Sequence, residues 1–135
     1  MEVRTYEPDD YESVKSLYLD EGSYGGQFDE DRDSPDRLNA EKDKILVAVE
    51  HDSQLIGTVT LFSDDRLAWL FRFAVKDNDP NTTSRLYEAA QDLARGAGHK
   101  QLLAYSPVDD SVLSGRYESL GFKKGNDFTA FWREI

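Results

Sequence analysis

The sequence contains no cysteine and only two histidines, His51 and His99, among its 135 residues. The lack of cysteine excludes a disulfide framework, thiolate catalysis and cysteine-type zinc sites. The two histidines are far apart and stand in turn-like surroundings, so they do not supply the ligands of a zinc site. We therefore expect no metal centre.

Long hydrophobic runs are also missing. None approaches the roughly 18 apolar residues that a membrane-spanning helix needs. The N-terminus, Met1-Glu2-Val3-Arg4, has neither the basic region nor the apolar core of a signal peptide. These absences predict a soluble, cytoplasmic protein that does not act at a membrane.

Positive charge is scarce, and the formal net charge is −11. A phosphate backbone needs a basic surface, so nucleic-acid partners are not expected. The charge is unevenly placed, because residues 1–44 hold 14 acidic against 6 basic side chains. Two interpretations stay open: a surface that keeps the protein soluble or suits a salty cytoplasm, or a field that attracts cationic substrates.

Bulky core residues are plentiful, with seven Phe, seven Tyr and two Trp. A chain of this length and composition can form a stable core without metals or disulfides. We expect one domain over residues 1–135.

Hydrophobic periodicity predicts the element order β-α-α-β-β-β-α-β-α-β. The expected strands lie near 3–6, 45–50, 55–62, 67–75, 101–105 and 127–135, and the expected helices near 7–20, 34–44, 79–96 and 109–120. The strand at 67–75 is almost wholly apolar, which is typical of a central strand covered on both faces. A helix separates it from the strand at 101–105, so these two should be parallel neighbours. The fold class is α/β, with an antiparallel N-terminal half and a parallel β-α-β C-terminal half in one sheet flanked by helices.

The stretch from Arg116 to Phe122 reads Arg-Tyr-Glu-Ser-Leu-Gly-Phe. It resembles the (Y/F)-Y-E-x-L-G-F ending of the GNAT superfamily, the acyl-CoA-dependent N-acyltransferases. The element order resembles that family from end to end, and so does the opening, with Val3-Arg4 before Pro8-Asp9-Asp10-Tyr11. The resemblance implies acetyl-CoA as cofactor and transfer of its acetyl group to an amine of a small molecule or peptide.

The resemblance also implies roles for particular residues on the acyl side. Exposed backbone groups at Phe73, Ala74 and Val75 would bind the pantetheine arm. The general acid of the family maps onto Tyr117, which would protonate the leaving thiolate. The alternative for this residue is a core tyrosine, since it shares one helical face with two leucines, Leu113 and Leu120.

Asp110 stands where the family usually has an asparagine that orients the cofactor. Its other interpretation is a helix cap, a role for which aspartate is well suited.

The phosphate loop departs from the family pattern. The Q/R-x-x-G-x-G/A motif maps onto Asn78, Asn81 and Thr83, so neither glycine is present. Glycine there lets the backbone approach a pyrophosphate closely. Asp77 and Asp79 add negative charge, and Asp79 could itself cap the helix. The donors that we predict to contact the phosphates are Asn81, Thr82, Thr83, Ser84 and Arg85.

No residue can be assigned as the general base. Some members carry a glutamate at the position of Trp69, so a loop carboxylate such as Asp64, Asp65 or Glu21 would have to act through water.

The acceptor side is predicted from the acidic segment around Asp29 and Asp31, flanked by Tyr24 and Phe28. Carboxylates and aromatic rings together suit an ammonium or guanidinium group. Two functions remain in view: an N-acetyltransferase, or a GNAT-fold binding or regulatory module without productive turnover of acetyl-CoA. The last predicted strand, rich in Phe and Trp, could pair at a homodimer interface or fill the core.

Overall fold

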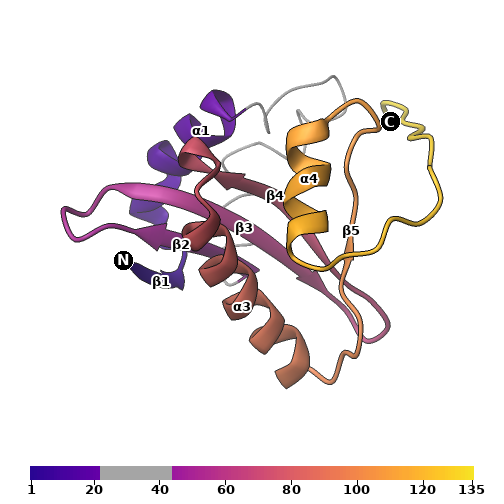
Figure 1. Cartoon of the computed structure of the whole chain (residues 1–135), viewed down its shortest axis with the longest axis horizontal. Coiled ribbons are helices and arrows are strands. Elements are labelled where there is room, and N and C mark those ends of the chain that lie inside the picture. The colour runs from indigo at the N-terminus through magenta and orange to yellow at the C-terminus, as the bar shows by residue number, and fades with distance from the viewer. Residues whose placement is uncertain (22–43) are drawn as a thin grey trace.

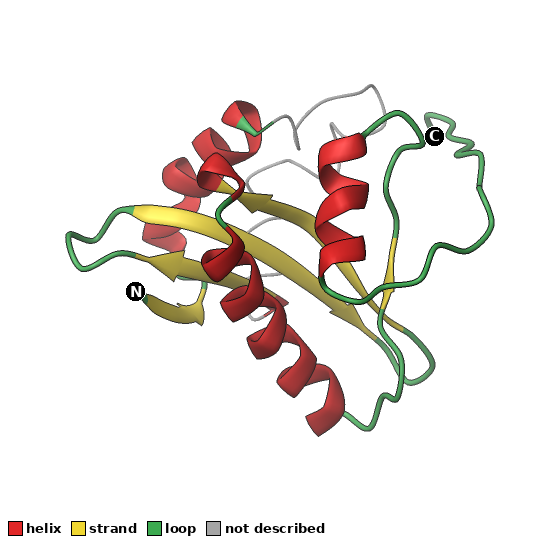
Figure 2. Cartoon of the chain, viewed as in Figure 1, coloured by secondary structure: helices red, strands yellow, loops and turns green. Residues whose placement is uncertain are grey.

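A computed structural model describes residues 1–21 and 44–135 of the chain. It contains one five-stranded sheet with strand order β1-β2-β3-β4-β5, flanked by helices (Figures 1 and 2). The elements are β1 (Glu2–Thr5), η1 (Pro8–Asp10), α1 (Tyr11–Asp20), β2 (Ile45–Val49), β3 (Leu55–Ser63), β4 (Ala68–Val75), η4 (Lys76–Asn78), α3 (Pro80–Gly96), β5 (Leu103–Ala104) and α4 (Ser111–Ser119). No helix within the two described segments is long and apolar enough to cross a membrane. The helix predicted over 34–44 lies outside the described residues, apart from its last position.

Strand direction divides the sheet as predicted. β1, β2, β3 and β4 pair in succession, each antiparallel to the next. β4 and β5 are parallel, and α3 and its flanking turns connect them. The mixed sheet with an antiparallel N-terminal half and a parallel β-α-β unit is therefore confirmed.

Helices cover both faces of the sheet, which explains why β2 is apolar at every position. Side chains alternate between faces along a strand. Accordingly, Ile45 and Val47 join the core cluster beneath α1, whereas Leu46 and Ala48 join the cluster beneath α3. The first cluster includes Val14, Leu17 and Tyr18 of α1, and the second includes Leu86, Ala90 and Ala94 of α3.

β4 has the two-sided burial expected of a central strand at its C-terminal end. Phe73 and Val75 point into the core under α3, and Ala74 points into the core under α1. A β-bulge precedes them, because Thr58 pairs with Ala74 while Thr60 already pairs with Phe71. The extra residue bends and twists the strand there.

A glycine ends α4. Gly121 has a φ of +90°, a left-handed conformation that suits glycine at the C′ position. The N–H of Phe122 donates to the carbonyl oxygen of Tyr117 at 3.1 Å, and the N–H of Gly121 donates to that of Glu118 at 3.0 Å. These two bonds form a Schellman motif and turn Phe122 back onto the helix.

The prediction of a last strand over 127–135 is wrong. Residues 123–135 have no assigned secondary structure, and the Phe131 side chain is 92% exposed. A strand needs a hydrogen-bonded partner, and β5 offers an edge of only two residues where 101–105 were expected. The aromatic residues of this segment favour an extended backbone, but they do not supply this partner.

Candidate active site

β4 continues beyond its pairing with β5. The parallel pairs are Trp69 with Leu103 and Leu70 with Ala104, whereas β4 runs on to Val75. The three residues predicted to hold a pantetheine arm, Phe73–Val75, therefore lie past the last β4–β5 pair (Figure 1). A strand edge beyond its last pair can hydrogen-bond an extended ligand that carries amide groups.

Tyr117 of α4 packs against this part of β4. Its ring meets the Phe73 ring edge to face at a centroid distance of 6.2 Å, and the Phe122 ring at 5.4 Å. The side chain is 6% exposed, and burial raises the pKa of the Tyr117 hydroxyl well above its ordinary value, against the opposing effect of the Arg116 charge. The hydroxyl therefore keeps its proton to higher pH than an exposed tyrosine, and burial also makes it a weaker acid.

Asp110 caps α4. Its Oδ1 accepts a hydrogen bond of 2.9 Å from the backbone N–H of Leu113, three residues along. This confirms the capping interpretation. A contact of Asp110 with cofactor stays a prediction.

Asp79 caps α3 in the same way. Its Oδ2 accepts from the backbone N–H of Thr82 at 2.8 Å and from the Thr82 hydroxyl at 2.7 Å. The hydrogen bond from the Thr82 hydroxyl, followed by that from the Thr82 N–H, holds the pKa of Asp79 below its usual range. The predicted internal cap is confirmed, so a carboxylate sits where an anion would bind to this helix end.

The cap changes which donors a phosphate could reach. Thr82 and Thr83 are buried, and the Thr83 hydroxyl donates to the Asp79 carbonyl oxygen at 2.9 Å. The hydroxyls of both threonines are therefore engaged within the protein. The remaining predicted contacts, Asn81, Ser84 and Arg85, are exposed on the first turns of α3. Asn81 and Thr83 lie inside the helix, so these two positions need no positive φ.

Arg116 is a site residue that the sequence interpretation missed. It is 6% exposed and reaches from α4 to β4, where its Nη1 donates to the carbonyl oxygen of Phe73. Its Nη2 and Nε donate to Oδ1 of Asn78 at 3.0 and 3.3 Å. The guanidinium lies 5.6 Å from the centre of the Phe73 ring. The signal in the sequence was a charged residue at a position where the family motif has Tyr or Phe.

In the part of the chain that the structure describes, Arg116 is held by hydrogen bonds to uncharged groups. Within residues 1–21 and 44–135 it forms no ion pair, since the one ion pair there joins Arg4 to Asp10. Burial accordingly lowers the pKa of the Arg116 guanidinium, with Tyr117, Glu21 and Asp110 acting in the opposite direction. Burying a cation is costly unless it is paired or hydrogen-bonded, and the three hydrogen bonds from Arg116 offset this cost.

The candidates for a general base are not equally suited. Backbone N–H groups of Arg66 and Leu67 donate to Asp64 Oδ1 at 2.7 and 2.8 Å. They hold the pKa of Asp64 below its usual range, which makes this carboxylate a weaker base. Trp69, at the position where relatives place glutamate, stacks on Phe62 at 5.3 Å.

The predicted acceptor residues Tyr24, Phe28, Asp29 and Asp31 lie outside the described residues.

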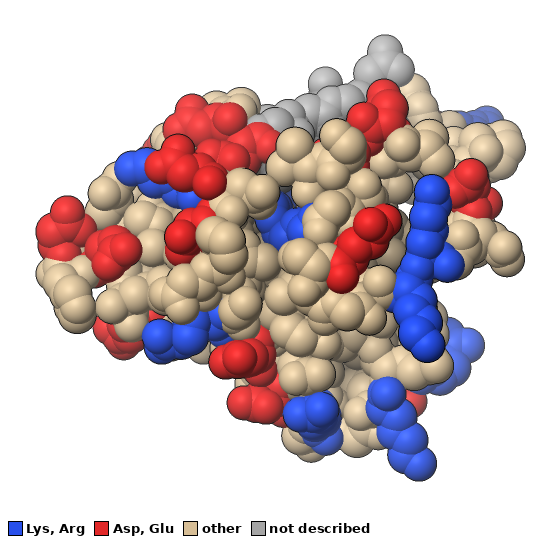
Figure 3. Space-filling model, viewed as in Figure 1, with Lys and Arg blue, Asp and Glu red and all other residues tan. Residues whose placement is uncertain are grey.

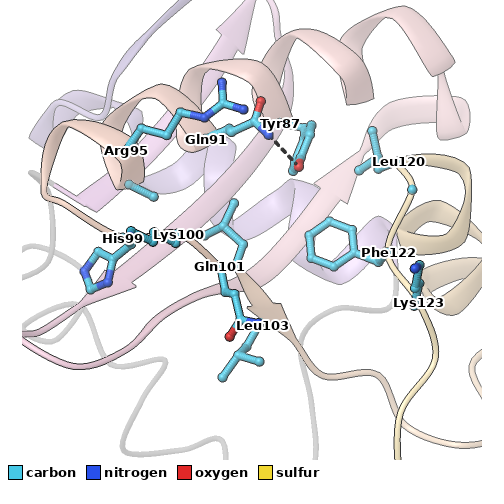
Figure 4. A pocket seen from close by; sticks show the side chains of 13 residues that line it. Tyr87, Gln91, Arg95, His99, Lys100, Gln101, Leu103, Leu120, Phe122 and Lys123 are labelled. Carbon is cyan, nitrogen blue, oxygen red and sulfur yellow. Dashed lines mark hydrogen bonds between the residues drawn. The ribbon is translucent and has the colours of Figure 1, made fainter.

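A separate pocket of about 380 Å³ lies beside the C-terminal half of α3 (Figure 4). The rings of Tyr87 and Phe122 meet there edge to face at a centroid distance of 5.7 Å, and Gln91 donates to the Tyr87 hydroxyl at 3.1 Å. None of the predicted site residues within 1–21 and 44–135 lines this pocket. In the described part of the chain, no group of three His, Asp or Glu side chains is arranged to hold a metal ion.

Comparison with known proteins connects this geometry to a class. No protein-family model and no curated sequence matches the chain. Its structure is similar to the aminoglycoside 6′-N-acetyltransferase AAC(6′)-Ih from Acinetobacter baumannii, with a TM-score of 0.76 and 11% identity over 99% of this chain and 98% of that one. It is similar to an acetyltransferase from Streptococcus agalactiae, with a TM-score of 0.74 and 21% identity over 98% and 92%. It is also similar to Rv2747 from Mycobacterium tuberculosis, solved in complex with CoA and NLQ, with a TM-score of 0.72 and 16% identity over 96% and 77%.

The chain thus has the fold of acyl-CoA-dependent N-acyltransferases. It is the GNAT fold, as the Tyr-Glu-Ser-Leu-Gly-Phe motif predicted.

Proposed function

We propose that this chain is an N-acetyltransferase that moves an acetyl group from acetyl-CoA to an amine of a small molecule or peptide. One observation carries the proposal: Tyr117, a buried tyrosine, packs on Phe73 where β4 continues past β5. In an acyltransferase fold, this is a proton donor beside a strand edge able to hold a thioester substrate.

The residues would divide the reaction as follows. The amine nitrogen forms a bond to the thioester carbonyl carbon, and the carbon–sulfur bond breaks. Tyr117 would give its hydroxyl proton to the leaving thiolate, while the amine loses its proton through water to a carboxylate. Backbone N–H groups on the free edge of β4 would stabilise the negative charge that develops on the carbonyl oxygen.

The open donors of α3 would serve the other end of the cofactor. Asn81, Ser84 and Arg85 are exposed on its first turns, and Arg85 brings a positive charge. Thr82 and Thr83 would contribute only if they released Asp79. We therefore expect acetyl-CoA to bind with modest affinity, because the Asp79 carboxylate repels the pyrophosphate.

For the acceptor we propose a cationic amine. Asp29 and Asp31, flanked by Tyr24 and Phe28, supply negative charge and aromatic faces of the kind that bind ammonium groups. Two structurally similar proteins bear the name aminoglycoside 6′-N-acetyltransferase, which supports an amine of a small molecule.

We also propose that the chain forms a homodimer through its C-terminal segment. Phe128, Phe131 and Trp132 are exposed by 74%, 92% and 48% in this segment. Multi-angle light scattering of the full chain tests it: a monomer mass at micromolar concentration would contradict the dimer.

The alternative function is a GNAT-fold binding or regulatory module without turnover. The Asp79 cap and the position of Arg116 favour it, since both occupy groups that an acetyl-CoA molecule would use.

Thermal unfolding with and without acetyl-CoA, followed by assay of free-thiol release with a panel of amines, separates the two functions. A ligand at 100 times its Kd stabilises the folded state by about 2.7 kcal/mol, a shift of several degrees for this size. Stabilisation together with amine-dependent thiol release supports the transferase. Stabilisation without release under any amine supports the module. No stabilisation contradicts acetyl-CoA binding and also supports the module, as one that has lost productive cofactor binding.

A further inference from the structure

A side chain of the protein already contacts the part of β4 that extends past its pairing with β5. Arg116 donates to the carbonyl oxygen of Phe73, a residue past the last β4–β5 pair. Its planar guanidinium therefore does what an amide N–H of an extended ligand would do at this edge. The contact is buried, so it is made in a low-dielectric environment where a charge-assisted hydrogen bond is strong.

Two further hydrogen bonds fix the guanidinium at the end of β4. Both run to Oδ1 of Asn78 in η4. Asn78 has a φ of +51°, and Asp77 before it has a φ of +53°. Asn and Asp tolerate this left-handed conformation better than other side chains, and it turns the loop directly after β4. Arg116 thus spans the strand edge from Phe73 to the loop before α3.

We propose that Arg116 occupies the place of the pantetheine arm, so that acyl-CoA must displace this side chain in order to lie along β4. The inference rests on the proposed function, because it takes acyl-CoA as the ligand of that edge. It adds a specific cost to cofactor binding that comes from one residue of this chain.

Net charge alone predicts the opposite effect of removing Arg116. Acyl-CoA is an anion, and Figure 3 shows Lys and Arg atoms at the surface between the first turns of α3 and α4. A basic group that bound the phosphates would strengthen cofactor binding, and its loss would weaken it. Occupation of the strand edge predicts tighter binding after its loss. The two possible roles of Arg116 therefore predict opposite changes in cofactor affinity when the residue is replaced.

Calorimetric titration with two probes tests the proposal. CoA carries the pantetheine arm, whereas adenosine 3′,5′-bisphosphate carries phosphates but no arm. Arg116→Met keeps most of the side-chain volume and removes the donors. We expect it to bind CoA roughly 10- to 100-fold more tightly than the unmodified chain, because the cofactor no longer has to break a charged hydrogen bond. Binding of adenosine 3′,5′-bisphosphate should change less than about threefold.

Arg95→Met is the matched control, because it removes the same charge from an exposed position near the far end of α3. It should alter neither affinity by more than the small general effect of net charge. Circular dichroism and thermal unfolding verify that each variant is folded. If Arg116→Met does not fold, Asn78→Gly gives the same test. It removes the acceptor of two hydrogen bonds and suits the positive φ.

The outcomes are distinct. Tighter CoA binding with unchanged adenosine 3′,5′-bisphosphate binding supports the proposal. This includes the case in which only the variant binds CoA, which would contradict transferase activity of the unmodified chain. Equal or weaker CoA binding by the variant, when the unmodified chain binds CoA, overturns the proposal and leaves the proposed function standing. If neither chain binds either probe, the proposed function and this inference both fail.

Discussion

Arg116 on α4 donates a hydrogen bond to the main-chain carbonyl oxygen of Phe73 on β4, 43 positions earlier in the chain. The neighbouring residue, Tyr117, packs its ring on the Phe73 side chain. Two consecutive residues of α4 therefore contact Phe73: Arg116 binds its main-chain carbonyl oxygen, and Tyr117 packs on its ring. The first contact covers the strand edge, and the second positions the proposed proton donor.

The role of Tyr117 predicts a loss of turnover with little loss of binding. Tyr117→Phe deletes one hydroxyl and keeps the ring that packs on Phe73. If the hydroxyl protonates the leaving thiolate, kcat should fall by about 10²–10⁴-fold while the Kd for acetyl-CoA is nearly unchanged. Tyr87→Phe, on the neighbouring helix α3, is the control. Unchanged turnover in Tyr117→Phe would show that the residue is part of the core only.

The raised pKa of Tyr117 predicts a pH dependence of stability with a definite sign. The ordinary pKa is 10.0, and the folded value lies above it. Between these two values the unfolded chain has lost the proton and the folded chain keeps it, so the free energy of unfolding falls as pH rises above about 10. Tyr117→Phe should reduce this fall in thermal unfolding between pH 9 and 11, whereas Tyr105→Phe, at an exposed position, should not. An identical pH profile for Tyr117→Phe and the unmodified chain would contradict the assigned burial.

The Asp79 cap predicts a change in cofactor affinity. Asp79→Asn keeps an acceptor for the Thr82 N–H and removes the negative charge at the start of α3. Acetyl-CoA should bind about two- to fivefold more tightly at low salt, and the gain should shrink as salt is added. Asp92→Asn, further along α3, controls for net charge. Weaker binding by Asp79→Asn would mean that the carboxylate organises the loop for the cofactor.

The acidic N-terminal region predicts salt dependence for the acceptor. If the carboxylates near Asp29 and Asp31 attract a cationic amine, kcat/KM should fall steeply between about 0.05 and 0.5 M salt, as exposed charges are screened. A neutral amine tested in parallel should show little change. If the best acceptors are neutral or anionic, or if kcat/KM does not change with salt, the acidic segment only keeps the protein soluble.

Replacing each of two glycines by alanine should change stability in opposite directions, because one is tightly packed and the other is not. A Cβ on Gly57 of β3 would lie 2.8 Å from side-chain atoms of Leu86 and Thr82, so Gly57→Ala should lower the free energy of unfolding by about 1–3 kcal/mol. A Cβ on Gly115, inside α4, meets nothing within 4 Å. Gly115→Ala should therefore raise stability by about 0.5–1 kcal/mol. Urea denaturation measures both, and a neutral Gly57→Ala would contradict the close packing of α3 on β3.

Elements that depend on local interactions could be predicted from the amino-acid sequence alone. The apolar run from Ile45 implied burial on both faces, since no face of that strand is left polar. Asp79-Pro80 and Asp110 marked helix starts because a carboxylate there can accept from the free N–H groups, and both do so. Gly121 marked the end of α4 because its left-handed φ suits glycine. The Tyr-Glu-Ser-Leu-Gly-Phe motif, together with the order of these elements, was enough to predict the fold.

Contacts between residues that are distant in the chain could not be predicted in this way, because they depend on how the elements pack together. The residues at 127–135 are rich in Phe and Trp and were predicted as a strand, but β5 is too short to pair with them. The sequence allows the hydroxyls of Thr82 and Thr83 to donate to phosphates, but in the structure both donate to Asp79. In the sequence, Arg116 is one charged residue within a helix motif, and nothing there indicates its contacts. Its burial against Phe73 and Asn78 arises from the meeting of α4 with the end of β4, and periodicity along one helix carries no information about that contact.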